Sequence, residues 1–342
     1  MAKQLVPVIE AKGLTKNFQI PLKSPGLIGA VKHLVSPHYQ SKVAVNAIDL
    51  RIEAGENVAY VGPNGAGKST TIKMLTGVLV PSSGEIRVLG LIPYKQRVEN
   101  AQNIGVVFGH RSQLWWDLPV QESLRLLGDI YSVPAPIFQH NLSNLIELLD
   151  LGPLLSIPTR QLSLGQRMRA DIAASLLHSP SILYLDEPTV GLDVAVKARI
   201  RTFIKDLNYQ HGVTVVLTSH DLSDIEELCE RIVMIDKGKI VFDDSLTALK
   251  KRFIRERVIH IDLREPIGNA VDLVRQVLAD ITTITVCQPE PYQISIRFEI
   301  EQISTSVIIE RLLPLLPIQD FRFEELGIES IIRQLYEGNL RL

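Results

Sequence analysis

The sequence predicts an α/β fold whose sheet core is interrupted by a helical subdomain and followed by a small α+β domain. Three observations support this fold class. Residues 58–61 form an apolar run that leads through a glycine-rich segment into a helical pattern. Residues 182–186 and 213–218 are two further, mostly apolar runs, as expected of buried parallel strands. From about 114 to 178 the apolar residues recur at three-to-four spacing, which is typical of packed helices.

The glycine-rich segment matches a P-loop. Residues 58–70 read VAYVGPNGAGKST, with the pattern G-x-x-x-x-G-K-[ST] between a strand and a helix. The glycines allow a tight turn that aims backbone N–H groups at phosphate oxygens, near the positive end of the following helix. Lys68 then reaches the β- and γ-phosphates and the Ser69 hydroxyl ligates Mg²⁺. The alternative is a glycine-rich turn without a ligand. The predicted phosphate-binding residues are Gly62, Pro63, Asn64, Gly65, Ala66, Gly67, Lys68, Ser69 and Thr70.

Composition is that of an ordinary globular protein of about two domains. The 342 residues are 46% hydrophobic and 22% charged, which is enough apolar material for a large core. A formal net charge of -2 argues against a dedicated nucleic-acid binder, and we expect no nucleic-acid partner. The two cysteines, Cys229 and Cys287, are too few for a zinc cluster or a disulfide framework, which fits a reducing cytosol.

Membrane-directed segments are not expected. Gln4, Pro7 and Glu10 interrupt the apolar residues near the N-terminus, so the start of the chain does not resemble a secretion signal. No run of about 18 apolar residues occurs, so we expect a chain that does not span a membrane by itself.

Alternating patterns predict strands around the P-loop. Residues 5–18 and 42–53 alternate between apolar and polar side chains, and the Pro- and Gly-punctuated residues 20–38 between them predict an inserted loop with room for one short helix. Residues 81–90 predict a turn followed by a short strand, and residues 102–108 a buried strand.

The C-terminal part, residues 246–342, predicts a second domain after an N-terminal domain of residues 1–245. The run SLTALKKRFIRER, residues 245–257, leads into this domain and has a helical pattern. The order βαββαβ then predicts a small ferredoxin-like domain closed by a final helix. The expected strands are 257–264, 282–288, 292–299 and 317–323, and the expected helices are 268–279, 303–313 and 327–337. This part holds no catalytic constellation, so it is either a regulatory or dimer-supporting domain or a structural appendage.

Four further motifs follow the P-loop in order. Residues 162–166, LSLGQ, differ from an LSGGQ signature only at the third position, and residues 182–187, ILYLDE, match a Walker B strand followed by a glutamate. Residues 191–193, GLD, look like a D-loop, and His220 looks like a switch histidine. Taken singly, LSLGQ is compatible with a helix cap, LDE with a solvated strand end, and His220 with an ordinary surface or core histidine. Together they make the chain similar to the ATP-binding subunits of ABC transporters over about residues 5–245, which implies a P-loop ABC ATPase core.

This resemblance assigns roles to residues around a Mg²⁺·ATP complex. Glu187 polarises the attacking water, and His220 binds the γ-phosphate and supports Glu187. Asp186 anchors Mg²⁺ through water, while Ser69 binds it directly. The family has a glutamine near Mg²⁺ where this chain has His110, and an imidazole is a poorer Mg²⁺ ligand than an amide oxygen.

The resemblance also implies that two copies share their sites. Ser163, Gly165 and Gln166 of one copy complete the nucleotide site of the other in a head-to-tail homodimer. An aromatic ring stacks on adenine about two dozen residues before the P-loop in this family. Tyr39 occupies that place if the preceding loop is an insertion, and Phe18 is the competing candidate.

The segment LWWDLP, residues 114–119, holds both tryptophans. In the family the corresponding surface receives a coupling helix from the membrane subunit. Adjacent residues of a helix or strand face different directions, so we expect one ring to be buried and the other to be available to a partner.

The resemblance implies an ATPase subunit that energises an ABC-2-type exporter through a separately encoded permease. Such a subunit is cytoplasmic and peripheral on the inner face of the cell membrane. A soluble ABC ATPase acting on ribosomes or DNA is the alternative, although such chains usually have two cassettes or a long coiled-coil insertion. A non-hydrolysing regulatory cassette is disfavoured because Lys68, Asp186, Glu187 and His220 are all present.

Overall fold

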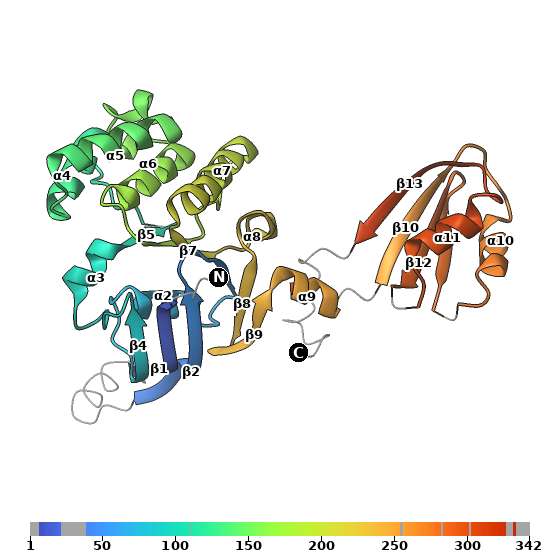
Figure 1. The fold of residues 1–342 in the computed structure, drawn as a ribbon, viewed down its shortest axis with the longest axis horizontal. Coiled ribbons are helices and arrows are strands. Elements are labelled where there is room, and N and C mark those ends of the chain that lie inside the picture. Colours follow the sequence, from blue (N-terminus) through green and yellow to red (C-terminus); the bar gives the residue numbers. More distant parts are fainter. Residues whose placement is uncertain are drawn as a thin grey trace, which may run out of the picture. The chain divides into compact units, whose positions relative to one another are not determined.

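The chain divides into two compact units, Met1–Leu246 and Thr247–Leu342 (Figure 1). The structure, a computed structural model, describes a defined part of the 342 residues. The described residues are 7–21, 39–109, 111–253, 256–281, 283–300, 302–325 and 331–332.

A six-stranded sheet with the order β5-β6-β7-β3-β8-β9 forms the centre of the first unit. Its strands are β3 (Asn57–Val61), β5 (Ile104–Phe108), β6 (Ile182–Asp186), β7 (Thr214–Thr218), β8 (Arg231–Asp236) and β9 (Lys239–Ser245). The pairs are parallel except for the antiparallel pair of β8 and β9. Because β6, β7 and β3 are neighbours and parallel, the segments after their carboxyl ends meet at one edge of the sheet.

A second, antiparallel sheet with the order β2-β1-β4 packs beside the P-loop helix. Its strands are β1 (Pro7–Pro21), β2 (Tyr39–Glu53) and β4 (Ser83–Val88), and the helix is α2 (Lys68–Leu75). One apolar core joins the two sheets and this helix, since Leu14, Tyr60, Ile72 and Tyr184 belong to the same buried cluster. The strands predicted on both sides of the P-loop are thus confirmed.

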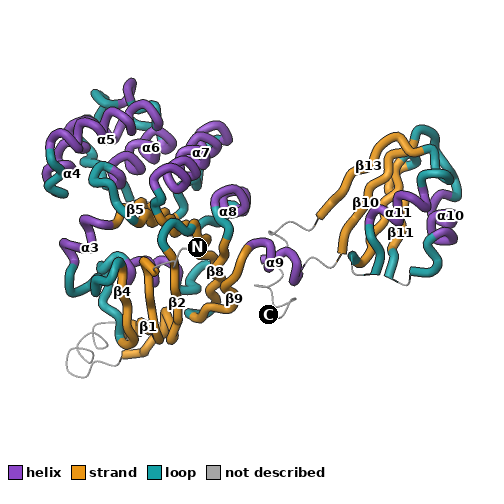
Figure 2. The backbone as a smooth tube through the Cα atoms, viewed as in Figure 1, coloured by secondary structure: helices purple, strands orange, loops and turns teal. Residues whose placement is uncertain are grey.

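The helical subdomain contains α4 (Val120–Ile130), α5 (Ala135–Leu148) and α6 (Leu164–Leu176). These helices lie together, apart from the antiparallel sheet (Figure 2). Helix α7 (Val194–His211) follows β6, and the short helix α8 (Leu222–Leu228) follows β7. Helix α3 (Arg97–Asn103) was not predicted: it covers the first residues of the segment expected to be a strand, and β5 begins only at Ile104.

The second unit has the predicted βαββαβ order. After helix α9 (Leu246–Phe253) come β10 (Glu256–Leu263), α10 (Ala270–Val277), β11 (Thr285–Glu290), β12 (Gln293–Glu299), α11 (Thr305–Leu312) and β13 (Ile318–Glu325). The sheet order is β11-β12-β10-β13 and every pair is antiparallel, which confirms the ferredoxin-like arrangement. The predicted final helix, 327–337, lies outside the described residues except for 331–332.

No helix in the described part of the chain is both long enough and apolar enough to cross a membrane.

Candidate active site

The P-loop connects β3 to α2, and two of its glycines have no room for a side chain. A Cβ at Gly62 would lie 2.3 Å from the carbonyl oxygen of Ile235. Gly67 caps α2 with a φ of 117°, and its Cβ would lie 2.6 Å from the carbonyl oxygen of Ala44. Only glycine combines this close backbone approach with a left-handed conformation. The loop is therefore an open cradle at a helix N-terminus, as phosphate binding requires.

Lys68 lies inside this cradle with 8% of its surface exposed. Its Nζ donates hydrogen bonds to the carbonyl oxygens of Gly62, at 2.5 Å, and Pro63, at 3.2 Å. Burial lowers the pKa of Lys68, and the nearby carboxylates of Glu187 and Asp186 oppose this shift. The ammonium group thus faces both the loop and the acids at the end of β6.

A cavity of about 570 Å³ adjoins the P-loop. One wall comes from the loop and α2, a second from the hairpin of β1 and β2, and Glu187 closes a third side. Its lining residues are Phe18, Gln19, Ile20, Lys42, Ala44, Asn64, Gly65, Gly67, Lys68, Ser69, Thr70 and Glu187. A phosphate cradle and an aromatic ring thus line the same cavity, as a nucleotide requires.

The two acids at the carboxyl end of β6, Asp186 and Glu187, form hydrogen bonds with β7. The Thr218 hydroxyl donates to Asp186 Oδ1 at 2.5 Å, and the Glu187 N–H donates to the Thr218 carbonyl oxygen at 2.9 Å. Glu187 has a φ of 56°, a left-handed conformation that costs a non-glycine residue about 1–3 kcal/mol and is found mostly at functional sites. Its Oε1 lies 2.9 Å from Nε2 of His220. The predicted water-polarising acid and the predicted switch histidine are therefore in direct contact.

The LSLGQ segment forms a capping box at the start of α6. The Ser163 side chain accepts from the Gln166 N–H, and the Gln166 side chain accepts from the Ser163 N–H. Gly165 packs closely against α7, since a Cβ there would lie 3.3 Å from a methyl carbon of Val196. None of these three signature residues is among the described residues that line the P-loop cavity of the same chain.

The structure places Phe18, the competing candidate for adenine stacking, and not Tyr39 at the P-loop cavity. Tyr39 is 56% exposed and does not line the P-loop cavity, whereas Phe18 does. In the hairpin, Phe18 pairs with Lys42 of the cavity wall, and Tyr39 pairs with Pro21 three positions further from it. The prediction counted residues back from the P-loop and so favoured Tyr39. The distance of a side chain from the cavity depends instead on its position along the hairpin.

The expectation for the tryptophans is also wrong. Trp115 and Trp116 are 40% and 55% exposed, so neither ring is buried. They lie in an irregular turn before α4, where the alternation of a regular element does not apply. The Arg167 guanidinium lies over the Trp116 ring, 5.9 Å from its centroid.

His110 lies outside the described residues, so its predicted place near Mg²⁺ is untested. The nearby Gln113 side chain donates to the Val106 carbonyl oxygen at 2.5 Å, and its N–H donates to Asp171. The side-chain amide of Gln113 is thus held against β5.

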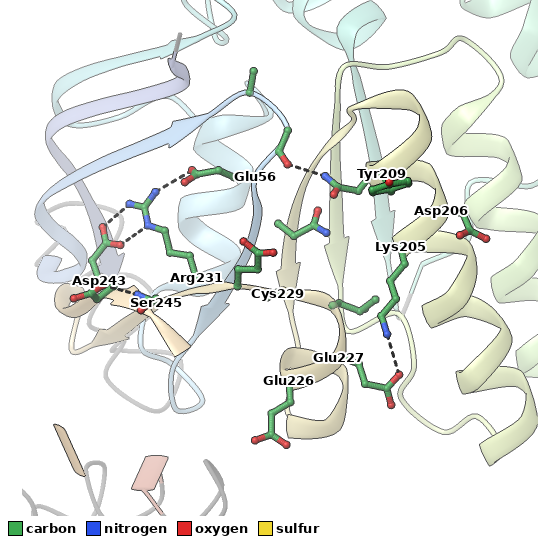
Figure 3. A pocket seen from close by; sticks show the side chains of 17 residues that line it. Glu56, Lys205, Asp206, Tyr209, Glu226, Glu227, Cys229, Arg231, Asp243 and Ser245 are labelled. Atoms are coloured by element: carbon green, nitrogen blue, oxygen red, sulfur yellow. Dashed lines mark hydrogen bonds and ion pairs between the residues drawn. The ribbon is translucent and has the colours of Figure 1, made fainter. Parts of the chain in front are cut away.

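A larger cavity, of about 1060 Å³, lies at the opposite edge of the six-stranded sheet, where β3 and β8 begin (Figure 3). Arg231 joins Glu56, at 3.0 Å, to Asp243, at 2.7 Å, across one side of it. Among the residues that the structure describes, its lining includes none from the P-loop or from the motifs after β6 and β7. Its size alone therefore does not make it the nucleotide site.

Comparison with known proteins decides the family. A profile described as "ABC transporter" matches residues 45–190. The linearmycin resistance ATP-binding protein LnrL of Bacillus subtilis (strain 168) is 30% identical over 308 residues, covering 89% of this chain and 96% of that protein. This chain is an ATP-binding subunit of the ABC transporter family. As an ABC ATPase it binds and hydrolyses ATP.

Two other ABC proteins extend the comparison. The Nod factor export ATP-binding protein I of Cupriavidus pinatubonensis (strain JMP 134 / LMG 1197) is 31% identical over 252 residues, covering 73% of this chain and 75% of that protein. A dimeric ATP-binding cassette, solved in a post-hydrolysis state with ADP and Pi, is 26% identical with a TM-score of 0.58. That match covers 70% of this ABC chain and 98% of the solved one.

Proposed function

We propose that this chain energises an ABC-2-type exporter, and that two copies work head to tail with a separately encoded permease. The observation that carries this proposal is the Glu187–His220 contact beside the P-loop cavity, with the signature residues of the same chain outside that cavity. A single copy then provides one half of each of two sites.

Within one copy, the loop amides and Lys68 hold the β- and γ-phosphates at the start of α2. Their positive charge is directed at the place where negative charge develops during phosphoryl transfer. Glu187 orients and polarises the attacking water, and His220 fixes the Glu187 carboxylate and contacts the γ-phosphate. The ring of Phe18 stacks on the adenine from the hairpin side of the cavity.

The oxygen donors beside the cradle fit Mg²⁺. Ser69 is exposed at the start of α2, and Asp186 uses one carboxylate oxygen for Thr218 and retains a second. No group of three or more histidine, cysteine or acidic side chains that could hold a metal occurs among the described residues. This pattern suits Mg²⁺, which is usually held by one or two protein oxygens, water and substrate phosphates. When bound, the ion neutralises phosphate charge, and Ser69 and Asp186 would hold it.

The second copy supplies Ser163, Gly165 and Gln166. Because the Ser163 oxygen accepts the Gln166 N–H, its hydroxyl hydrogen remains to donate to a phosphate. Gly165 lies in the first turn of α6, where the helix dipole favours an anion. In this arrangement closure of the dimer completes both sites.

Export rather than import is supported by the names of the relatives, which include a linearmycin resistance protein and a Nod factor export protein. The exposed rings of Trp115 and Trp116 offer the permease an aromatic contact surface. The chain would then lie on the inner face of the cell membrane. The ferredoxin-like unit would act as a regulatory or dimer-supporting domain.

Co-purification from native membranes tests this proposal. A tagged full-length chain is purified from detergent-solubilised membranes, and a co-purifying polytopic protein is expected. Replacing both tryptophans by alanine should reduce the recovery of this polytopic protein. Tyr209→Ala, at an exposed aromatic residue elsewhere in the chain, is the control and should leave the recovery unchanged. Recovery of the chain mainly with ribosomes or DNA would instead support the soluble alternative.

A further inference from the structure

Asp224 of α8 is a buried carboxylate to which the proposed mechanism gives no role. Its exposed fraction is 0%. One oxygen, Oδ2, accepts hydrogen bonds from the hydroxyls of Thr189 and, at 2.9 Å, Ser219. The other, Oδ1, accepts from Arg201 Nε at 2.6 Å. Three donors surround this carboxylate, which explains how a charge is tolerated in the interior.

The two hydroxyl donors come from the loops after β6 and β7, which carry Glu187 and His220. Thr189 lies two residues after Glu187, and Ser219 directly precedes His220. Both donors are nearly inaccessible, with exposed fractions of 1% and 6%. A single carboxylate oxygen therefore joins the loop after β6 to the loop after β7, and these are the loops whose side chains meet at 2.9 Å.

The third donor connects the same carboxylate to α7. Arg201 lies in the middle of that helix, and Asp193 of the GLD segment caps its N-terminus by accepting from the Val196 N–H. Arg201 also pairs with Glu227 at 2.9 Å. The carboxylate of Glu227 is 46% exposed and faces the larger cavity, where Lys205 lies 3.7 Å from it (Figure 3).

We propose that Asp224 is a positioning residue for ATP hydrolysis. Its hydrogen bonds join the loops of Glu187 and His220 to each other and to α7, and so keep these two side chains in contact. The inference rests on the proposed roles of Glu187 and His220. Burial and direct bonds to both loops distinguish Asp224 from Glu227, which shares only the Arg201 contact.

Steady-state ATPase assays of the full-length chain, together with equilibrium binding of a fluorescent ATP analogue, test this role. Asp224→Asn places an amide NH₂ where a carboxylate oxygen now accepts, so the donors that bond to that oxygen, Thr189 and Ser219 at Oδ2 or Arg201 at Oδ1, lose their acceptor. We expect kcat to fall by about 10- to 100-fold, the usual effect of a small misplacement of catalytic groups. The KM and the Kd for nucleotide should change by less than about threefold, because the phosphate cradle is untouched.

A second pair of variants removes the risk that Asp224→Asn fails to fold. Thr189→Val keeps the shape of the side chain and loses its hydroxyl, whereas Thr189→Ser keeps the hydroxyl. Of these two Thr189 variants, Thr189→Val should lower kcat and Thr189→Ser should not. Glu227→Gln, which removes another of the acids that pair with Arg201, should leave kcat unchanged. In a His220→Ala background, Thr189→Val should cause no further loss, because the contact that it supports is already missing.

Equal kcat values for Thr189→Val and Thr189→Ser would overturn the inference. So would a full further loss from Thr189→Val in the His220→Ala background, since a merely structural effect would be additive. These results differ from a failure of the proposed function. Near-normal turnover by Glu187→Gln would remove the catalytic acid itself, whatever the Thr189 variants do.

Discussion

The stability of the first unit should depend on pH through Asp171. This side chain of α6 is 5% exposed, and its Oδ1 accepts from the Ser112 hydroxyl and the Gln113 N–H, both at 2.8 Å. Burial raises its pKa from 3.8 to about 6, although these hydrogen bonds oppose the shift. The native state thus holds the proton more tightly than the unfolded chain. The corresponding stability is present below the unfolded pKa and is lost as the pH rises through about 6.

The gap between the two pKa values corresponds to a loss of about 3 kcal/mol in the free energy of unfolding as the pH rises. About 2 kcal/mol of this loss falls between about pH 4.5 and 7.5. Asp171→Asn abolishes this titration, while its amide oxygen can accept both hydrogen bonds. Relative to the parent, the variant should therefore gain about 2 kcal/mol in unfolding free energy over that range.

Urea unfolding followed by tryptophan fluorescence measures this difference, because both tryptophans lie in the first unit. Asp206→Asn, at an exposed carboxylate of α7, controls for the change in charge. If the difference between Asp171→Asn and the parent stays constant with pH, or shifts as little as in the control, the assigned pKa is wrong.

Three further predictions concern nucleotide binding and hydrolysis. Glu187→Gln should keep ATP binding and slow phosphate release by about 10²- to 10⁴-fold, so a smaller loss would exclude it as general base. Phe18→Ala should weaken ATP binding by about 5- to 100-fold in equilibrium titrations, the range for one lost base stack, whereas Tyr39→Ala should not. Equal effects of the two changes would contradict the role proposed for Phe18. Gly62→Ala should abolish binding because its Cβ meets a carbonyl oxygen at 2.3 Å, and Gly152→Ala, whose Cβ would have no atom of a described residue within 4 Å, is its control. Retained affinity in Gly62→Ala would argue against the cradle.

The P-loop and the acids at the end of β6 could be predicted from sequence because their requirements are local. Gly62 and Gly67 must be glycine because a Cβ at either position would meet a backbone carbonyl oxygen. The strands of the central sheet are recognisable because a strand that is buried on both faces is continuously apolar. The ferredoxin-like unit was predictable for a similar reason, since Ile259, Ile261 and Leu263 alternate toward a single core.

Contacts between distant segments could not be predicted in this way. The bonds that join Thr189 and Ser219 to Asp224 depend on the neighbouring positions of β6 and β7, and no sequence motif marks them. The choice between Phe18 and Tyr39 likewise depended on strand register. A prediction that combined the hairpin pairing with the position of the P-loop would have favoured Phe18.

Complementation between inactive variants tests most directly whether two copies share their sites. Lys68→Ala removes the phosphate-binding lysine, and Ser163→Ala removes the signature hydroxyl, so each variant alone should show almost no ATPase activity. In an equal mixture, half of the dimers are mixed and each of these has one of two sites intact, which predicts recovery of about a quarter of the parental activity. Activity no higher than the sum of the separate variants, or full activity of Ser163→Ala by itself, would contradict a site built from two chains.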